Sequence, residues 1–231
     1  MSLILCTDTS TKACTAAVAN NGMVISKIQI KQEGYKHAEQ LHDLLQSVLD
    51  EAGIMWKDLD AVAVGKGPGS YTGLRIGVSA VKGICYARKI PLIALPTLQI
   101  MAVNAASKSS LNAQALLRPM IDARRMEVYT AAYSSEFNEL EKVQAHVLEE
   151  DSFAEELIKN PVYFFGDGMD KCRHLFEQRS NAHFIDDVIP AAWSMAVLSQ
   201  CAFEEKMFED VAYFEPFYLK EFLAKPPKKL I

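Results

Sequence analysis

The sequence predicts an α/β protein of two domains, each built on a mixed sheet flanked by helices. Three short strands joined by tight turns open the chain, over residues 2–7, 13–19 and 23–30. A buried strand, a glycine-containing turn and a helix then follow one another twice, first over residues 61–88 and again over residues 162–178. This repeated order indicates that the two halves of the chain have related topologies.

A polar stretch of small residues, A-A-S-K-S-S-L-N at residues 105–112, predicts the domain boundary. We expect one domain over residues 1–107 and a second over residues 108–231, and it is open whether the final helix or the tail returns to the first domain. The 231 residues, half of them hydrophobic, are enough to bury a sizeable core.

Composition and charge exclude several classes of protein. The net charge of −5 argues against broad nucleic-acid binding by bulk electrostatics. The N-terminal apolar run contains Asp8 and has no basic flank, so we expect no signal peptide. No apolar run reaches the ~18 residues that span a membrane. Five cysteines without C-x-x-C spacing indicate reduced thiols, and we expect a cytoplasmic protein.

Hydrophobic periodicity predicts the longest helix at residues 37–52, where Gly53 ends it. This helix carries His37, Glu39 and His42, but five residues separate the two histidines. They therefore lie on different faces and predict no zinc site. The apolar face consists of Leu41, Leu44, Leu45, Val48 and Leu49.

The same reasoning assigns the remaining elements. We expect further strands at residues 61–64, 91–95, 115–122, 126–133, 143–148 and 162–165. We expect further helices at residues 72–88, 96–106, 153–159, 169–178 and 190–208.

A glycine-rich loop, G-K-G-P-G-S-Y-T-G at residues 65–73, joins a predicted strand to a predicted helix. Ser70 and Thr72 are candidate N-caps, and a helix N-terminus suits a phosphate or another anion. The P-loop, the dinucleotide fingerprint and the nucleophile elbow all fail to match this spacing. The alternative is a structural turn whose glycines let the helix pack tightly on the sheet.

Asp8 ends the first predicted strand, and two interpretations of it stay open. A carboxylate there is suited to hold a hydrated Mg²⁺ beside a nucleotide. The alternative is a turn aspartate that accepts hydrogen bonds from its own backbone.

The helix over residues 72–88 carries small residues at spacings of four and three, namely Gly73, Gly77, Ala80 and Gly83. Glycine lowers helix propensity by up to ~1 kcal/mol at each position, so the pattern requires a reason. Close approach of another helix, from this chain or from a partner, provides one.

The tail is basic, with Lys220, Lys225, Lys228 and Lys229. Such a tail is typical of a solvated end, or of a contact with RNA or an acidic partner.

Five motifs together resemble the TsaB (YeaZ) family of the actin/sugar-kinase/Hsp70 (ASKHA) superfamily. They are D-T-S-T at residues 8–11, H-A-E-Q-L at 37–41, G-P-G-S-Y-T-G-L-R-I-G at 67–77, D-A-R-R-M-E-V-Y at 122–129 and Y-L-K at 218–220. The resemblance covers essentially the whole chain and implies two ASKHA-type domains. It further implies a bacterial subunit of the machinery that forms threonylcarbamoyladenosine at adenosine 37 of tRNA.

The resemblance implies a scaffold and activator without catalytic residues. Its partners are a TsaD-type paralogue, a TsaE-type ATPase, a second copy of itself when alone, and tRNA through the complex. The paralogue carries an H-x-x-x-H metal motif, and at the matching positions this chain has Thr97 and Met101. We therefore expect no metal and no cofactor on this chain alone, because ATP and the metal belong to the partners.

Two sets of site residues follow from the resemblance. A nucleotide-type loop, expected to be vestigial, consists of Asp8, Thr9, Ser10, Gly67, Pro68 and Gly69. A partner interface on the two N-terminal helices consists of His37, Leu41, Leu45, Gly73, Ile76, Gly77, Ala80 and Gly83.

Two alternative functions belong to the enzyme class. One is an autonomous ASKHA-type ATPase or kinase that uses Asp8 and the loop at residues 67–69, although a phosphate-loop lysine and an obvious base are missing. The other is a glycoprotease-like peptidase, although the sequence has no H-E-x-x-H motif and Ser70 has no evident partner base.

Overall fold

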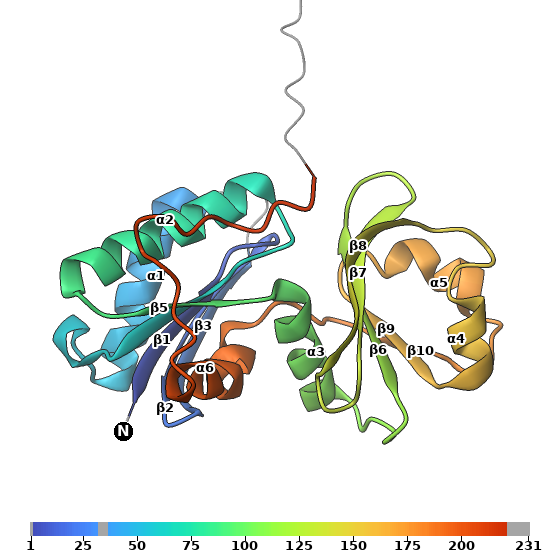
Figure 1. Ribbon diagram of the computed structural model, residues 1–231, viewed down its shortest axis with the longest axis horizontal. Coiled ribbons are helices and arrows are strands. Elements are labelled where there is room, and N and C mark those ends of the chain that lie inside the picture. Colours follow the sequence, from blue (N-terminus) through green and yellow to red (C-terminus); the bar gives the residue numbers. More distant parts are fainter. Residues whose placement is uncertain (1, 32–36, 221–231) are drawn as a thin grey trace, which may run out of the picture.

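The computed structural model describes residues 2–31 and 37–220 and contains two five-stranded sheets, one from each half of the chain (Figure 1). The first sheet has the order β3-β2-β1-β4-β5. Its antiparallel strands are β1 (Leu3–Asp8), β2 (Ala13–Asn20) and β3 (Met23–Lys31), and its parallel strands are β4 (Ala61–Gly65) and β5 (Leu92–Leu95). The structure therefore confirms the predicted mixed sheet.

Four helices cover the two faces of this sheet. On one face lie α1 (His37–Ala52) and α2 (Tyr71–Arg88), which share a core with the apolar side chains of β1, β2 and β4. On the other face lie α3 (Thr97–Lys108) and α6 (Met195–Glu204). Helix α3 also packs against the second sheet, so it lies between the two halves (Figure 1).

The second sheet repeats the topology of the first. Its order is β10-β9-β6-β7-β8, where β6, β7 and β8 form the antiparallel meander and β9 and β10 add parallel strands. The bounds are β6 (Leu116–Asp122), β7 (Glu127–Tyr133), β8 (Glu139–Val147), β9 (Val162–Phe165) and β10 (Ala182–Ile185). Helices α4 (Ala154–Lys159) and α5 (Asp170–Phe176) pack on the face turned away from α3.

Three elements differ from the sequence prediction. Strand β8 begins four residues earlier than expected, and β10 was not predicted. The expected helix over residues 190–208 is a 3-10 turn at Ala192–Ser194 followed by the shorter α6. Helix α6 ends early because Lys206 adopts a left-handed conformation (φ 57°) and Met207 N bonds back to Ala202 O at 2.9 Å.

The C-terminal segment, residues 207–220, returns to the first sheet. Glu209 N donates to Leu92 O at the edge of that sheet, and Lys82 on α2 donates to the carbonyl oxygens of Ala212 and Phe214. The segment then passes along α2 and ends beside the second half (Figure 1). The division at residues 107 and 108 remains a prediction.

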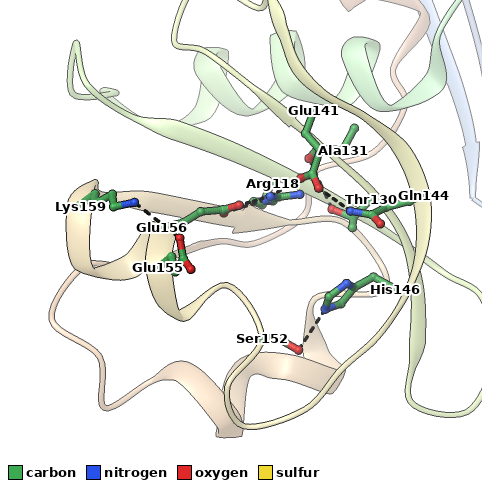
Figure 2. A network of polar contacts seen from close by, with 10 residues as sticks. All are labelled: Arg118, Thr130, Ala131, Glu141, Gln144, His146, Ser152, Glu155, Glu156 and Lys159. Atoms are coloured by element: carbon green, nitrogen blue, oxygen red, sulfur yellow. Dashed lines mark hydrogen bonds and ion pairs between the residues drawn. The ribbon is translucent and has the colours of Figure 1, made fainter.

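A buried arginine organises the polar interior of the second half (Figure 2). The Arg118 side chain on β6 is 2% exposed, forms ion pairs with Glu156 on α4 and Glu141 on β8, and stacks on Phe153 at 4.7 Å. Nearby, His146 Nε2 and Ser152 Oγ are 3.0 Å apart, and Ser152 Oγ also accepts from Glu149 N. These bonds tie α4 and its preceding turn to the sheet.

Within the part of the chain that the structure describes, no helix combines the length and the apolar character needed to cross a membrane.

Candidate functional site

A cleft of about 620 Å³ lies between the two halves, on the side where α2 begins. The first half contributes the β1–β2 turn and the glycine-rich loop. The second half contributes the β6–β7 turn, Tyr129 and Asp167, and the C-terminal segment closes one side. The residues that line the cleft are Ser10, Thr11, Lys12, Pro68, Gly69, Ser70, Tyr71, Thr72, Ile121, Asp122, Ala123, Arg124, Tyr129, Asp167, Phe217, Tyr218, Leu219 and Lys220.

The glycine-rich loop and the start of α2 pack directly onto the β1–β2 turn. A Cβ added to Gly69 would lie 2.7 Å from the Cβ of Ser10, and one added to Gly73 would lie 2.1 Å from the carbonyl oxygen of Thr9. Gly77 faces the Thr9 hydroxyl in the same way. Thr9 Oγ1 also donates to Gly73 O at 2.7 Å. The missing side chains are therefore what allows this close packing.

Several backbone donors of the loop already have partners within the chain. Gly67 N donates to Thr97 Oγ1 at 3.0 Å, Ser70 N donates to Ser10 O at 2.7 Å, and Gly73 N donates to the capping Ser70 Oγ at 3.2 Å. An anion at the helix N-terminus binds through such N–H groups. This geometry favours the structural interpretation of the loop over the anion-binding one.

Asp8 lies beneath the loop and is fully buried, and it is not one of the residues that line the cleft. Its Oδ1 accepts from Ser10 N and Ser10 Oγ, as expected for an aspartate that bonds to its own turn. Its Oδ2 has no partner among the described residues and packs so close to Gly65 that a Cβ there would overlap it. Burial raises the pKa of Asp8 to about 7, and the two hydrogen bonds from Ser10 offset only part of that effect.

The raised pKa of Asp8 predicts a pH-dependent stability. Between about pH 4 and pH 7 the folded protein holds a proton that the unfolded chain has lost, so the stability declines as pH rises through this window. Asp8→Asn removes the ionisable group and with it this pH-dependent contribution to stability. The quantity to compare is the free energy of unfolding of Asp8→Asn minus that of the wild type, at each pH. We expect this difference to be more positive at pH 8 than at pH 5, by on the order of 2–3 kcal/mol.

Urea unfolding followed by circular dichroism at both pH values measures this difference. Asp43→Asn on the exposed face of α1 is the control, for which we expect no such change. An equal difference at pH 5 and pH 8 for Asp8→Asn would show that Asp8 is ionised in the folded protein.

The positions matched to the paralogue's metal ligands lie in the packed interior. Thr97 is fully buried and its hydroxyl holds the Gly67 amide, while Met101 is 1% exposed and packs near Gly166. Among residues 2–31 and 37–220, no three His, Cys, Asp or Glu side chains gather closely enough to hold a metal ion. The expected lack of a metal and of a cofactor stays a prediction.

The residues predicted for the partner interface form two groups, one that faces the interior and one that is partly or fully exposed. Leu41 and Leu45 are fully buried in the core beneath α1, and Gly73 and Gly77 face the β1–β2 turn, so in the folded chain these four residues face inward. Ile76 and Ala80 are half-buried on α2, and Gly83 is exposed with no neighbour within 4 Å of an added Cβ. The side chain of His37 lies outside the described residues. Exposed α2 residues of the same surface include Ser79 and Tyr86.

Two of the motifs that carried the resemblance, at residues 122–129 and 218–220, meet at the cleft, although the sequence assigned no site role to their aromatic and charged residues. Tyr218 lies beside Tyr71, with ring centroids 4.8 Å apart, and Phe217 N anchors the segment by donating to Lys66 O. Lys220 pairs with Glu127 on β7 and thereby links the C-terminal segment to the second half. A further signal is that Arg124 and Arg125 lie between the strands predicted at residues 115–122 and 126–133, in a turn where Asn-Gly is usual.

The opposite wall carries a pair of carboxylates. Asp167 Oδ1 accepts from Asp122 N at 2.9 Å, and Lys171 Nζ lies 2.6 Å from Asp122 Oδ1. Partial burial acts to raise the pKa of Asp122, but hydrogen bonds from Lys171 and from Arg124 N outweigh it and lower the pKa. Asp122 is therefore held as a carboxylate at the rim of the cleft.

Two topologically equivalent mixed sheets with a cleft between them define the class of protein, an ASKHA-type, actin-like ATPase fold, as the sequence predicted. The chain belongs to the TsaD family, because the family model described as tRNA N6-adenosine threonylcarbamoyltransferase matches residues 24–228.

Named relatives and a solved structure confirm the resemblance to TsaB and YeaZ. The tRNA threonylcarbamoyladenosine biosynthesis protein TsaB of Escherichia coli K12 is 36% identical over 135 residues, which cover 58% of this chain and 56% of that protein. The TsaB protein of Haemophilus influenzae is 27% identical over 227 residues, covering 94% of this chain and 93% of that one. The structure of YeaZ from Pseudomonas aeruginosa superposes with a TM-score of 0.78 at 28% identity, over 95% of this chain and 100% of that chain. The chain thus spans little more than half the length of the E. coli relative in that match.

Proposed function

We propose that this chain is the non-catalytic subunit that binds and activates a TsaD-type paralogue during threonylcarbamoyl transfer to adenosine 37 of tRNA. The family model and the names of the relatives support a role in this pathway. In this proposal ATP and the metal are held by the TsaD-type and TsaE-type partners, and tRNA is reached within the complex.

The observation that supports the non-catalytic role is a hydrogen bond that joins the glycine-rich loop directly to the β1–β2 turn. In a nucleotide site, these two loops would lie on either side of a phosphate. Ser70 N donates to Ser10 O at 2.7 Å, and Gly69 is packed against Ser10 without room for a side chain. Thr97 occupies the position of a metal-binding histidine in the paralogue. Its hydroxyl accepts a hydrogen bond from Gly67 N and so helps to hold the glycine-rich loop in place. These residues stabilise the fold and leave the chemistry to a partner.

The proposed docking surface is the outer face of α2, defined by Ile76, Ser79, Ala80, Gly83 and Tyr86. Tyr86 is 81% exposed, although a large aromatic side chain gains most when it is buried. Gly83 has open space above it, which permits a second helix to approach closely. The same surface is available to a second copy of the chain when no TsaD-type partner is present.

An arginine placed at Gly83 tests this surface. The folded chain has room for the new side chain, so we expect Gly83→Arg to fold normally. A helix packed against this position would meet a bulky, charged group, so we expect the affinity for the TsaD-type partner to fall at least about tenfold. Isothermal titration calorimetry of the full chain against that partner measures the change.

Ile158→Arg is the matched control, because it introduces the same residue at a 76% exposed site on α4 of the second half. We expect its affinity to equal that of the wild type. Unchanged binding by Gly83→Arg would show that the partner docks elsewhere.

A further inference from the structure

We propose that the cleft between the two sheets binds one unstacked nucleotide of a single-stranded RNA segment. The inference rests on the proposed function, which brings RNA to the complex, and it assigns a contact to this chain itself. The cleft, about 620 Å³, falls within the range of ~300–1,000 Å³ that is usual for ligand sites.

Aromatic rings stand on both sides of the cleft. Tyr71 and Tyr218 form one wall, with ring centroids 4.8 Å apart, and Tyr129 of β7 lies on the other. The Arg75 guanidinium lies over the Tyr71 ring at 5.2 Å and donates to its hydroxyl. Proteins bind splayed-out RNA bases by stacking them on aromatic rings, and Tyr218 and Tyr129 both line this cleft. The arrangement therefore fits a base more readily than a purely polar ligand.

The charges in the cleft are nearly balanced. Lys220 is paired with Glu127, and Asp122 is paired with Lys171. The remaining lining charges are Lys12, Arg124 and Asp167, which leave one positive charge in excess. One phosphodiester carries a single negative charge, whereas a nucleoside triphosphate carries several. The balance favours a nucleotide within an RNA strand over free ATP.

The carboxylates at the rim provide hydrogen-bond acceptors for a base. Asp122 and Asp167 both line the cleft, and carboxylates accept hydrogen bonds from exocyclic amino groups. The same groups would repel the phosphates of a free nucleotide. Several loop donors that could hold those phosphates already bond within the chain, as Ser70 N does with Ser10 O and Gly67 N does with Thr97 Oγ1.

The turn that carries Arg124 is strained. Arg124 (φ 71°) and Arg125 (φ 48°) are consecutive left-handed residues, and each such residue costs on the order of 1 kcal/mol. Glycine or asparagine would occupy this turn without that cost. The turn thereby places an exposed arginine among the residues that line the cleft, where its guanidinium can reach a phosphate.

Fluorescence anisotropy with a fluorescein-labelled heptanucleotide of single-stranded RNA tests the proposal on the full chain, at roughly 50 mM salt, where phosphate contacts are strong. Arg124→Gly relieves the left-handed backbone, so we expect this variant to be no less stable than the wild type. We expect its RNA affinity to fall at least about fivefold. Tyr129→Leu keeps the apolar packing and removes a stacking surface, so we expect a fall of about tenfold.

Arg88→Ala is the matched control, because it removes the same charge at the opposite end of α2, and its RNA affinity should equal that of the wild type. Equal losses for Arg88→Ala and Arg124→Gly, or no RNA binding by the wild type, would overturn the proposal. Displacement of the RNA by micromolar Mg-ATP would also overturn it and assign the cleft to a free nucleotide. Binding of the TsaD-type partner by Arg124→Gly is measured separately, so a failure here is distinguishable from a failure of the docking surface.

Discussion

The double variant Glu141→Gln/Glu156→Gln is expected to lower the free energy of unfolding by about 3–5 kcal/mol. Both carboxylates pair with Arg118, whose side chain is only 2% exposed. Removing both negative charges leaves a guanidinium buried among apolar groups such as Phe153, and a buried charge without a counter-charge is costly. Urea unfolding of the variant measures the loss.

The converse change is expected to be milder. Arg118→Met keeps the packing on Phe153, and the two carboxylates left behind are 28% and 41% exposed, so they regain contact with water. We expect a loss of about 1–2 kcal/mol. Glu155→Gln is the control, since this 91% exposed partner of Lys159 should change stability by less than about 0.5 kcal/mol. Equal losses for the double variant and Arg118→Met would contradict this account of the network.

Gly73→Ala is expected to destabilise the protein by about 2–3 kcal/mol. The added methyl group would lie 2.1 Å from Thr9 O, so either α2 or the β1–β2 turn must move. The movement would also weaken the bond from Thr9 Oγ1 to Gly73 O. Thermal and urea unfolding of the purified variant measure this loss.

Gly83→Ala, on the same helix, has the opposite expectation. Apart from the backbone of α2 itself and the adjoining residues, no atom lies within 4 Å of the added methyl group. Alanine is the better helix former, so we expect a gain of about 0.5–1 kcal/mol. The two variants thus separate the α2 glycines that serve the fold, Gly73 and Gly77, from Gly83, the glycine assigned to docking. A loss for Gly83→Ala similar to that for Gly73→Ala would contradict the division.

The fold was largely predictable because its strongest signals are local. Helix α1 spans His37–Ala52 as predicted, since its leucines recur at helical spacing and Gly53 adopts the left-handed conformation (φ 67°) that ends it. Strand β10 gave no such signal, because its four residues are A-H-F-I and only Ile185 among them is buried, so no apolar run marks it. The left-handed Lys206 that ends α6 is likewise not encoded in a periodic pattern.

The site was less predictable because it depends on contacts between distant segments. Periodicity identified Leu41 and Leu45 as one apolar face but did not say that the chain's own core buries both of them. The pairing of Tyr218 with Tyr71 depends on the bond from Phe217 N to Lys66 O. Such contacts join residues far apart in the sequence and leave no spacing for a pattern to reveal.

The most direct test of the central claim follows threonylcarbamoyl transfer to tRNA by the matching TsaD-type and TsaE-type proteins, with and without this chain. The account predicts that transfer collapses when the chain is left out, that wild type and Ile158→Arg restore it, and that Gly83→Arg does not. Transfer at the same rate without the chain, or full restoration by Gly83→Arg, would contradict the account.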